Sequence, residues 1–202
     1  MPLLTAIKPQ KNKKRVNIYL DNKFGFGLDL ENFVKLGLKV EQEISEEEIG
    51  EIVKKAEFQK TLDKLLKFAT VRLRSEKEIR VWFKRKKVHE SIHKELFNRL
   101  NKLELIDDAK FAQWWLGQRS QFKPRGKRAL QAELRMKGIK KEVIESALSS
   151  LKIDEGKIAK ELLIKKEYKW KDLPKREARQ KMGQFLSRKG FSWEIIEKVL
   201  HS

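Results

Sequence analysis

Residue types that perform catalysis are scarce in this chain of 202 residues. It contains no cysteine, which removes thiolate nucleophiles, thiolate metal ligands and disulfides. The sequence also has no GxxxxGK(S/T) phosphate loop, no GxSxG turn and no HExxH pair.

His89 and His93 have the i,i+4 spacing of a metal-binding pair, but no third ligand is evident and the basic run 84–87 would repel a cation. Asp107 and Asp108 stand directly before an apolar helical pattern, which favours helix capping. We therefore predict a protein that is not an enzyme and that uses no cofactor or metal.

The basic residues carry a clearer chemical signal. The formal net charge is +19: residues 1–56 hold 10 Lys and Arg against 9 Asp and Glu, whereas residues 57–202 hold 38 against 20. Such a field attracts polyanions over a Debye length of about 8–10 Å at physiological salt. Nucleic acid is therefore the expected partner, and a membrane surface is not. We predict that binding is carried by basic side chains clustered on the second helix of three similar segments. They are Arg72, Arg74, Lys77, Arg80, Lys84, Arg85, Lys86, Lys123, Arg125, Lys127, Arg128, Arg135, Lys137, Lys175, Arg176, Arg179, Arg188 and Lys189.

These side chains indicate contacts with the phosphate backbone rather than base reading. Lysines and unpaired arginines on successive helices neutralise phosphates, but they form no bidentate constellation aimed at one groove. We therefore expect binding of single- and double-stranded DNA that depends steeply on salt and little on sequence.

The basic residues belong to an internal repeat with a period of about 50 residues. Segments 75–88, 126–139 and 178–191 align in one register, and Gly138 and Gly190 end the basic helix in two of them. The equivalent apolar positions include Phe83, Leu134 and Leu186, and one equivalent basic position holds Lys86, Lys137 and Lys189. This pattern predicts a mainly α fold of three tandem three-helix repeats in an elongated array, since each unit exposes an apolar face that its neighbour covers.

A small β element is expected before the repeats. Apolar residues alternate in 15–20 and 24–28 around a turn at Asp21–Lys23, which predicts a β-hairpin, and 3–7 adds a third strand. Short helices follow, one closed by Gly37 and one opened by a capping box at Ser45 that runs to Lys55, with a further helix beyond Phe58. The predicted domains are 1–56, with the hairpin and short helices, and three repeats at 57–105, 106–152 and 153–202.

The five tryptophans divide into two groups. Trp82, Trp114 and Trp193 fall on the apolar sides of their expected helices, which favours core packing. Trp115 and Trp170 are expected to be more open to a partner.

Four segments of the sequence resemble the RecX family, the bacterial modulators of the RecA recombinase. They are RSEKEIR at 74–80, LIDDAKFA at 105–112, KGI at 137–139 and SRKGFSWEII at 187–196. The resemblance covers about residues 57–202, and 19–28 is similar to the β extension carried by some members. One departure is Lys87, which stands where the other two repeats have glycine.

The resemblance implies a non-enzymatic regulator of DNA repair. Family members consist of tandem three-helix repeats that lie in the helical groove of a RecA–DNA filament. They inhibit the recombinase, ATPase and coprotease activities of RecA, and so act in homologous recombination and the SOS response. Because the first residues form no apolar signal-peptide core, we expect a cytoplasmic protein. We also expect a monomer, because the apolar face of each repeat is covered by its neighbour in the chain.

Two other classes of protein share part of this pattern. A helix-turn-helix transcription regulator also has three-helix units with basic helices, but one recognition helix per half-site does not explain three similar units. A nuclease would need acidic clusters facing one cleft. Sequence-independent, salt-sensitive binding would favour the modulator over the regulator, whereas metal-dependent turnover would favour an enzyme.

Overall fold

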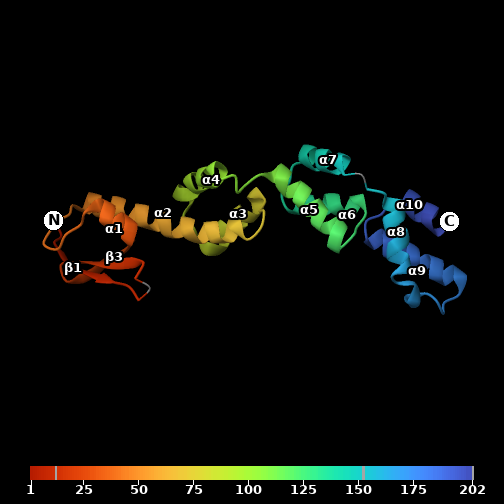
Figure 1. The fold of residues 1–202 in the computed structure, drawn as a ribbon, viewed down its shortest axis with the longest axis horizontal. Coiled ribbons are helices and arrows are strands. Elements are labelled where there is room, and N and C mark those ends of the chain that lie inside the picture. Colours follow the sequence, from red (N-terminus) through yellow and green to blue (C-terminus); the bar gives the residue numbers. More distant parts are fainter. Residues whose placement is uncertain (12, 152, 202) are drawn as a thin grey trace. The chain divides into compact units, whose positions relative to one another are not determined.

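The fold is mainly helical. The computed structural model describes residues 1–11, 13–151 and 153–201, in which a three-stranded sheet precedes ten α-helices (Figure 1). The predicted mainly α fold with a small N-terminal β element is therefore confirmed. The chain divides into two compact units, Met1–Val71 with Val88–Leu100, and Arg72–Lys87 with Asn101–Ser202. None of the described helices is long and apolar enough to span a membrane.

The N-terminal sheet is an antiparallel meander. Its strands are β1 (Leu4–Pro9), β2 (Arg15–Leu20) and β3 (Lys23–Asp29), paired in the order β1-β2-β3. Asp21 and Asn22 connect β2 to β3 with φ values of 46° and 63°, the left-handed pair that a two-residue type I′ turn requires. The predicted hairpin and the third strand are both present.

The sheet shares a hydrophobic core with the long helix α2 (Glu46–Thr70). Ile18 and Leu28 from the strands are fully buried, and they cluster with Ile52 and Ala56 from the first half of α2. A three-stranded sheet of this size depends on such packing, because small isolated sheets are marginally stable in water.

Helix α2 joins two helices that the sequence analysis separated. It begins at the predicted capping box, where the Ser45 hydroxyl accepts from the Glu48 amide and the Glu48 carboxylate accepts from the Ser45 amide. It then continues for 25 residues, because neither glycine nor proline interrupts positions 51–70. The predicted domain boundary at residue 56 therefore falls inside a continuous helix.

The remaining helices have the following bounds. They are α1 (Leu30–Leu36), α3 (Glu76–Lys86), α4 (His93–Lys102), α5 (Asp108–Phe122), α6 (Lys127–Met136), α7 (Lys141–Ser150), α8 (Glu155–Ile164), α9 (Lys175–Arg188) and α10 (Trp193–Leu200), with short 3₁₀ turns η1 (Glu90–Ile92) and η2 (Glu167–Lys169).

Helices α5–α7 and α8–α10 form two three-helix repeats with separate cores. Leu134 of α6 is fully buried in the first core with Phe111, and Leu186 of α9 is fully buried in the second with Ala159. Leu134 and Leu186 hold equivalent positions in the sequence repeat, so the register predicted from the sequence matches the packing.

The same backbone turn ends the second helix of each repeat. Gly138 and Gly190 both have φ of 85°, and Lys87 after α3 has φ of 52°. Lys87 therefore adopts the left-handed conformation that its glycine equivalents adopt, at a cost of about 1–2 kcal/mol for a residue with a Cβ atom. The departure noted in the sequence does not change how the helix ends.

Candidate nucleic-acid interface

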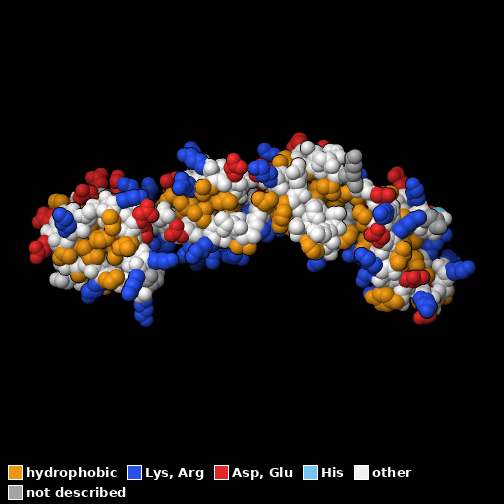
Figure 2. All heavy atoms as spheres, in the orientation of Figure 1, with side chains coloured by type: hydrophobic (Ala, Val, Ile, Leu, Met, Phe, Trp, Pro, Cys, Tyr) orange, Lys and Arg blue, Asp and Glu red, His pale blue; other side chains and the backbone are white. Residues whose placement is uncertain are grey.

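The predicted binding residues lie on α3, α6 and α9 or within four residues of these helices, and they form two groups by exposure. The exposed ones are Lys77, Arg80, Lys84, Arg85, Lys86, Lys123, Lys127, Arg128, Arg135, Lys175, Arg176, Arg179 and Arg188. The half-buried ones are Arg72, Arg74, Arg125, Lys137 and Lys189. On the face drawn in Figure 2, Lys and Arg side chains occur on both units, and acidic side chains are densest near the N-terminal end of the chain.

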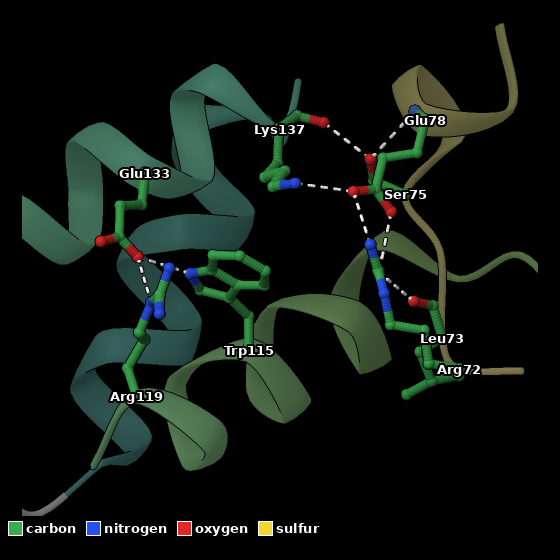
Figure 3. Close-up of polar contacts among 8 residues, drawn as sticks. All are labelled: Arg72, Leu73, Ser75, Glu78, Trp115, Arg119, Glu133 and Lys137. Atoms are coloured by element: carbon green, nitrogen blue, oxygen red, sulfur yellow. Dashed lines mark hydrogen bonds and ion pairs between the residues drawn. The ribbon is translucent and has the colours of Figure 1, made fainter. Parts of the chain in front are cut away.

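Two of the half-buried cations hold one carboxylate (Figure 3). Arg72 donates to Glu78 through its two terminal guanidinium nitrogens, at 2.9 and 3.0 Å, and the Lys137 ammonium lies 2.7 Å from the same carboxylate. Burial alone would raise the pKa of Glu78, but hydrogen bonds from Arg72 and Lys137 outweigh it and hold that pKa below its ordinary value. Glu78 thus ties the start of α3 to the end of α6.

A second carboxylate, that of Glu133, is contacted by cations and an indole within the α5–α7 repeat (Figure 3). Glu133 accepts from the Trp115 indole at 2.8 Å and from Arg119 Nε at 2.6 Å. Arg125 Nε lies 3.1 Å from the other oxygen of Glu133, without the alignment of a hydrogen bond. The Arg119 guanidinium is also 4.5 Å from the centre of the Trp115 ring, a cation–π distance. Sequence analysis missed Arg119 and Glu133, although the i,i+4 spacing of Trp115 and Arg119 was a signal for their contact.

The α3 helix is joined to the next repeat by capping interactions. The Ser75 hydroxyl, which caps α3, donates to the carbonyl oxygen of Lys137 at 2.8 Å. The first amide of α3, from Glu76, donates to the Asp108 carboxylate at 3.0 Å. Ser75 is fully buried, and its hydroxyl also accepts from the Glu78 amide at 3.3 Å.

We call this set of contacts at Ser75, Glu76, Asp108 and Lys137 a joint, and an equivalent joint occurs one repeat later. The Gly126 amide, at the cap of α6, donates to the carbonyl oxygen of Lys189 at 3.0 Å. The first amide of α6, from Lys127, donates to the Glu155 carboxylate at 2.8 Å. In each joint, the start of the second helix of one repeat contacts the end of the second helix of the next repeat. It also contacts a carboxylate at the start of that next repeat's first helix.

Glycines allow the backbones to approach closely at these joints. A Cβ atom on Gly138 would lie 2.6 Å from Lys77 Cβ, and one on Gly190 would lie 2.3 Å from Ala129 Cβ. Real Cβ atoms do not make such contacts, so glycine is required at both positions for contact as well as for backbone conformation.

Cations crowd around Lys189 at the second joint. Burial lowers the pKa of Lys189, and repulsion from Arg125, Lys166 and Lys123 lowers it further. An anion bound here would relieve that repulsion. Lys166, on the turn after α8, is a basic neighbour that the predicted set did not include.

The tryptophan predictions are confirmed in part. Trp82 is 4% exposed, and Trp114 packs against the core of its repeat. Trp193, predicted to be in the core, is instead 67% exposed. It is the first residue of α10, and the core of this repeat is filled instead by Phe191, just before the helix, and by Ile196 within it.

The two tryptophans predicted to be more open to a partner differ in burial. Trp115 is half-buried and makes the polar contacts described above. Trp170 is 7% exposed, with its ring 5.6 Å from that of Phe185. The prediction is wrong for Trp170, whose ring closes the α8–α9 connection, whereas Trp115 stays half-buried and donates its N–H within its own repeat.

The candidate metal and carboxylate residues have local roles. His89 contacts Ser91 and His93 contacts the Val88 carbonyl. Asp107 accepts from the amides at the start of α5, as the capping prediction expected. No group of three or more His, Cys, Asp or Glu side chains placed to hold a metal occurs among the described residues. Burial raises the pKa of Asp108, and the nearby carboxylates of Glu76 and Asp107 act in the same direction.

Comparisons with known proteins agree with this architecture. Family models match at residues 2–45 (regulatory protein RecX N-terminal domain), 107–148 (RecX second three-helix domain) and 154–200 (RecX third three-helix domain). A regulatory protein RecX from Bacillus licheniformis is 36% identical over 205 residues, covering 99% of this chain and 77% of that protein. The chain belongs to the RecX family. The resemblance found in the sequence is thereby confirmed.

Other RecX proteins match over similar lengths. A regulatory protein RecX from Bacillus subtilis is 34% identical, covering 99% of this chain and 76% of that protein. A crystal structure of a regulatory protein RecX matches with a TM-score of 0.74 and 27% identity over the full length of both chains. A crystal structure of RecX from Lactobacillus salivarius matches with a TM-score of 0.63 and 26% identity, covering 72% of this chain and 95% of that one.

Proposed function

We propose that this chain is a non-enzymatic regulator that binds a RecA–DNA filament and inhibits the recombinase, ATPase and coprotease activities of RecA. Membership of the RecX family supports a role in regulating RecA. The observation that carries the DNA contact is the recurrence of exposed basic side chains on the second helix of successive repeats. Such side chains suit phosphate contacts that are indifferent to sequence.

Burial and ion pairing support a smaller set of residues for this contact. Arg72, Arg125 and Lys137 each lie against a carboxylate and are half-buried, so we assign them to contacts within the protein, inside a repeat for Arg125 and at the joint between repeats for Arg72 and Lys137. Arg128 and Arg135 of α6 are exposed, and the described part of the chain offers neither an ion-pair partner. We propose that exposed residues of this second kind contact the filament.

The test is charge reversal on α6. We expect Arg128→Glu with Arg135→Glu to weaken co-sedimentation with RecA filaments on single-stranded DNA at least tenfold, because each change removes an attraction and adds a repulsion. Inhibition of the RecA ATPase should fall in parallel. Thermal unfolding should shift little, since exposed substitutions usually change stability by about 0.5 kcal/mol or less.

A matched control keeps the charge change and moves it to another helix. Lys160→Glu with Lys165→Glu reverses two exposed lysines at α8, the first helix of its repeat, and should bind filaments like the parent protein. If the α6 variant inhibits RecA as well as the parent, the second helices are not the interface. A preference of more than about a thousandfold for one duplex sequence would instead favour a transcription regulator.

A further inference from the structure

A basic groove lies between α9 and α10 in the last repeat. It encloses about 640 Å³ and is lined by Arg176, Arg179 and Arg188, together with Trp193 and Glu197. The arginines are exposed, and Glu197 also lies 3.3 Å from His201. The groove therefore combines several cations with one large aromatic ring.

The aromatic ring is not needed to fill the core. Trp193 is 67% exposed, whereas Phe191, Ile196 and Val199 from the same region are buried. Its flat face is large, and exposure leaves it available to a flat ligand. Tryptophan in this setting is typical of a stacking surface for nucleic-acid bases.

Helix α9 is longer than its counterparts and supplies much of the basic side. It has 14 residues, whereas α3 has 11 and α6 has 10. The repeat aligns Ala178 with the caps of the other two helices, so Arg176 lies in an extra turn. Arg176 and Arg188 are separated by about 18 Å along the helix, which is enough to contact several phosphates of one strand.

We propose that this groove binds a single-stranded segment of nucleic acid, with a base stacked on Trp193 and phosphates held by Arg176, Arg179 and Arg188. A single strand fits better than a duplex, because bases within a duplex are stacked on each other and present only their edges. An acidic peptide would satisfy the arginines but would make no use of the indole face. The inference rests on the proposed function only in taking nucleic acid as the partner.

The test separates base stacking from charge. Anisotropy measures binding of a short oligothymidine and of an abasic strand of the same length. The parent protein should bind oligothymidine at least about fivefold more tightly than the abasic strand, the factor expected for one stacked base. Trp193→Ala should remove this preference and leave abasic binding unchanged, whereas Trp193→Phe should retain part of it.

Two further variants test the role of charge in binding and provide a control for loss of an exposed aromatic ring. Arg179→Gln should weaken both ligands and reduce the slope of log affinity against log salt by about 0.7, the value for one phosphate contact on a single strand. Phe122→Ala removes an aromatic ring that is 66% exposed at the end of α5. It should leave the affinity for both strands unchanged. Thermal unfolding of all four variants should match the parent, because each altered side chain is exposed or conservatively replaced.

Three results would overturn the assignment. They are equal binding of the two strands by the parent protein, equal weakening of both strands by Trp193→Ala, and competition by oligoglutamate as effective as by oligothymidine. The filament assay distinguishes these from failure of the proposed function. If groove variants bind both strands like the parent while the α6 reversal abolishes RecA inhibition, only the groove assignment fails.

Discussion

Acidic residues decide which cations of this basic chain remain available. Glu78 engages Arg72 and Lys137, and Glu133 engages Arg119 and lies against Arg125. A basic side chain held in this way loses charge-assisted hydrogen bonds if it turns toward a phosphate. The exposed arginines and lysines of α3, α6 and α9 are therefore the better candidates for a partner.

The Glu78 ion pairs should make stability depend on pH. The folded-state pKa of Glu78 lies below its ordinary value of 4.5, so its contribution is complete above about pH 4.5 and is lost as pH falls through the folded-state pKa. Asp108 acts in the opposite direction. Burial raises its pKa, so its protonation at low pH removes the free-energy cost of a buried negative charge and favours the folded state.

We predict that Glu78→Gln lowers the free energy of unfolding near pH 7 by about 1–3 kcal/mol, because Arg72 and Lys137 are left half-buried without a counter-charge. The variant should also lose less stability than the parent between about pH 5 and about pH 3. Urea unfolding across this range measures both effects. Glu145→Gln, which alters an exposed pair with Lys141, is the control and should follow the parent curve. Parallel curves for Glu78→Gln and the parent would contradict the assignment.

At the scale of elements, the joints between repeats depend on glycine. Gly126 has φ of −70°, a value that any residue adopts, but a Cβ atom there would lie 2.3 Å from the carbonyl oxygen of Gly190. The neighbouring atoms belong to backbone and cannot move aside singly. Substitution at Gly126 therefore tests the joint without adding backbone strain.

We predict that Gly126→Ala lowers the free energy of unfolding by about 1–3 kcal/mol, the usual cost of overpacking. Gly117→Ala is the control, because nothing lies within 4 Å of a Cβ atom built there and Gly117 is inside α5. That change should stabilise the protein by about 0.5–1 kcal/mol through helix propensity. Thermal unfolding compares the two. Equal effects of the two substitutions would show that the joint is loose.

Local signals in the sequence predicted the elements well, and contacts between distant residues were missed. The hairpin at Asp21, the capping box at Ser45 and the left-handed turns at Gly138 and Gly190 each depend on a few adjacent residues. Ser75 and Glu78 also suggest a capping box, but only the Ser75 half forms, because the Glu78 carboxylate turns to Lys137, 59 residues away. No local pattern reveals that competition.

The sequence predicted which helices carry the basic residues of the candidate interface, but not which of those side chains are exposed. Charge and repetition pointed to α3, α6 and α9, yet they did not separate Arg135, which is exposed, from Lys137, which is half-buried. Trp193 was misplaced because α10 has only eight residues, and two turns of helix give too little periodicity to orient a side chain at its first position.

At the scale of the whole molecule, the repeated joint gives the predicted array a physical basis. The Ser75–Lys137 and Gly126–Lys189 hydrogen bonds use equivalent residues of successive repeats. Units that join their neighbours through equivalent residues stack in one direction. We propose repeats at 57–105, 106–152 and 153–202, of which the first begins within the continuous helix α2 and the last two contain the family matches at 107–148 and 154–200.

We predict that small-angle scattering will give a radius of gyration clearly above the roughly 17 Å of a spherical domain of this length. In a stacked array each repeat contacts only its neighbours, so length grows with repeat number while width does not. Light scattering across a concentration series should give a mass near 24.0 kDa, as expected for a monomer. A radius near 17 Å would contradict the linear array, and a mass that doubles with concentration would contradict the monomer. The Gly126→Ala variant adds an internal check: if the joints set the arrangement, loosening one should change the scattering curve at low angle while far-ultraviolet circular dichroism keeps its helical signal.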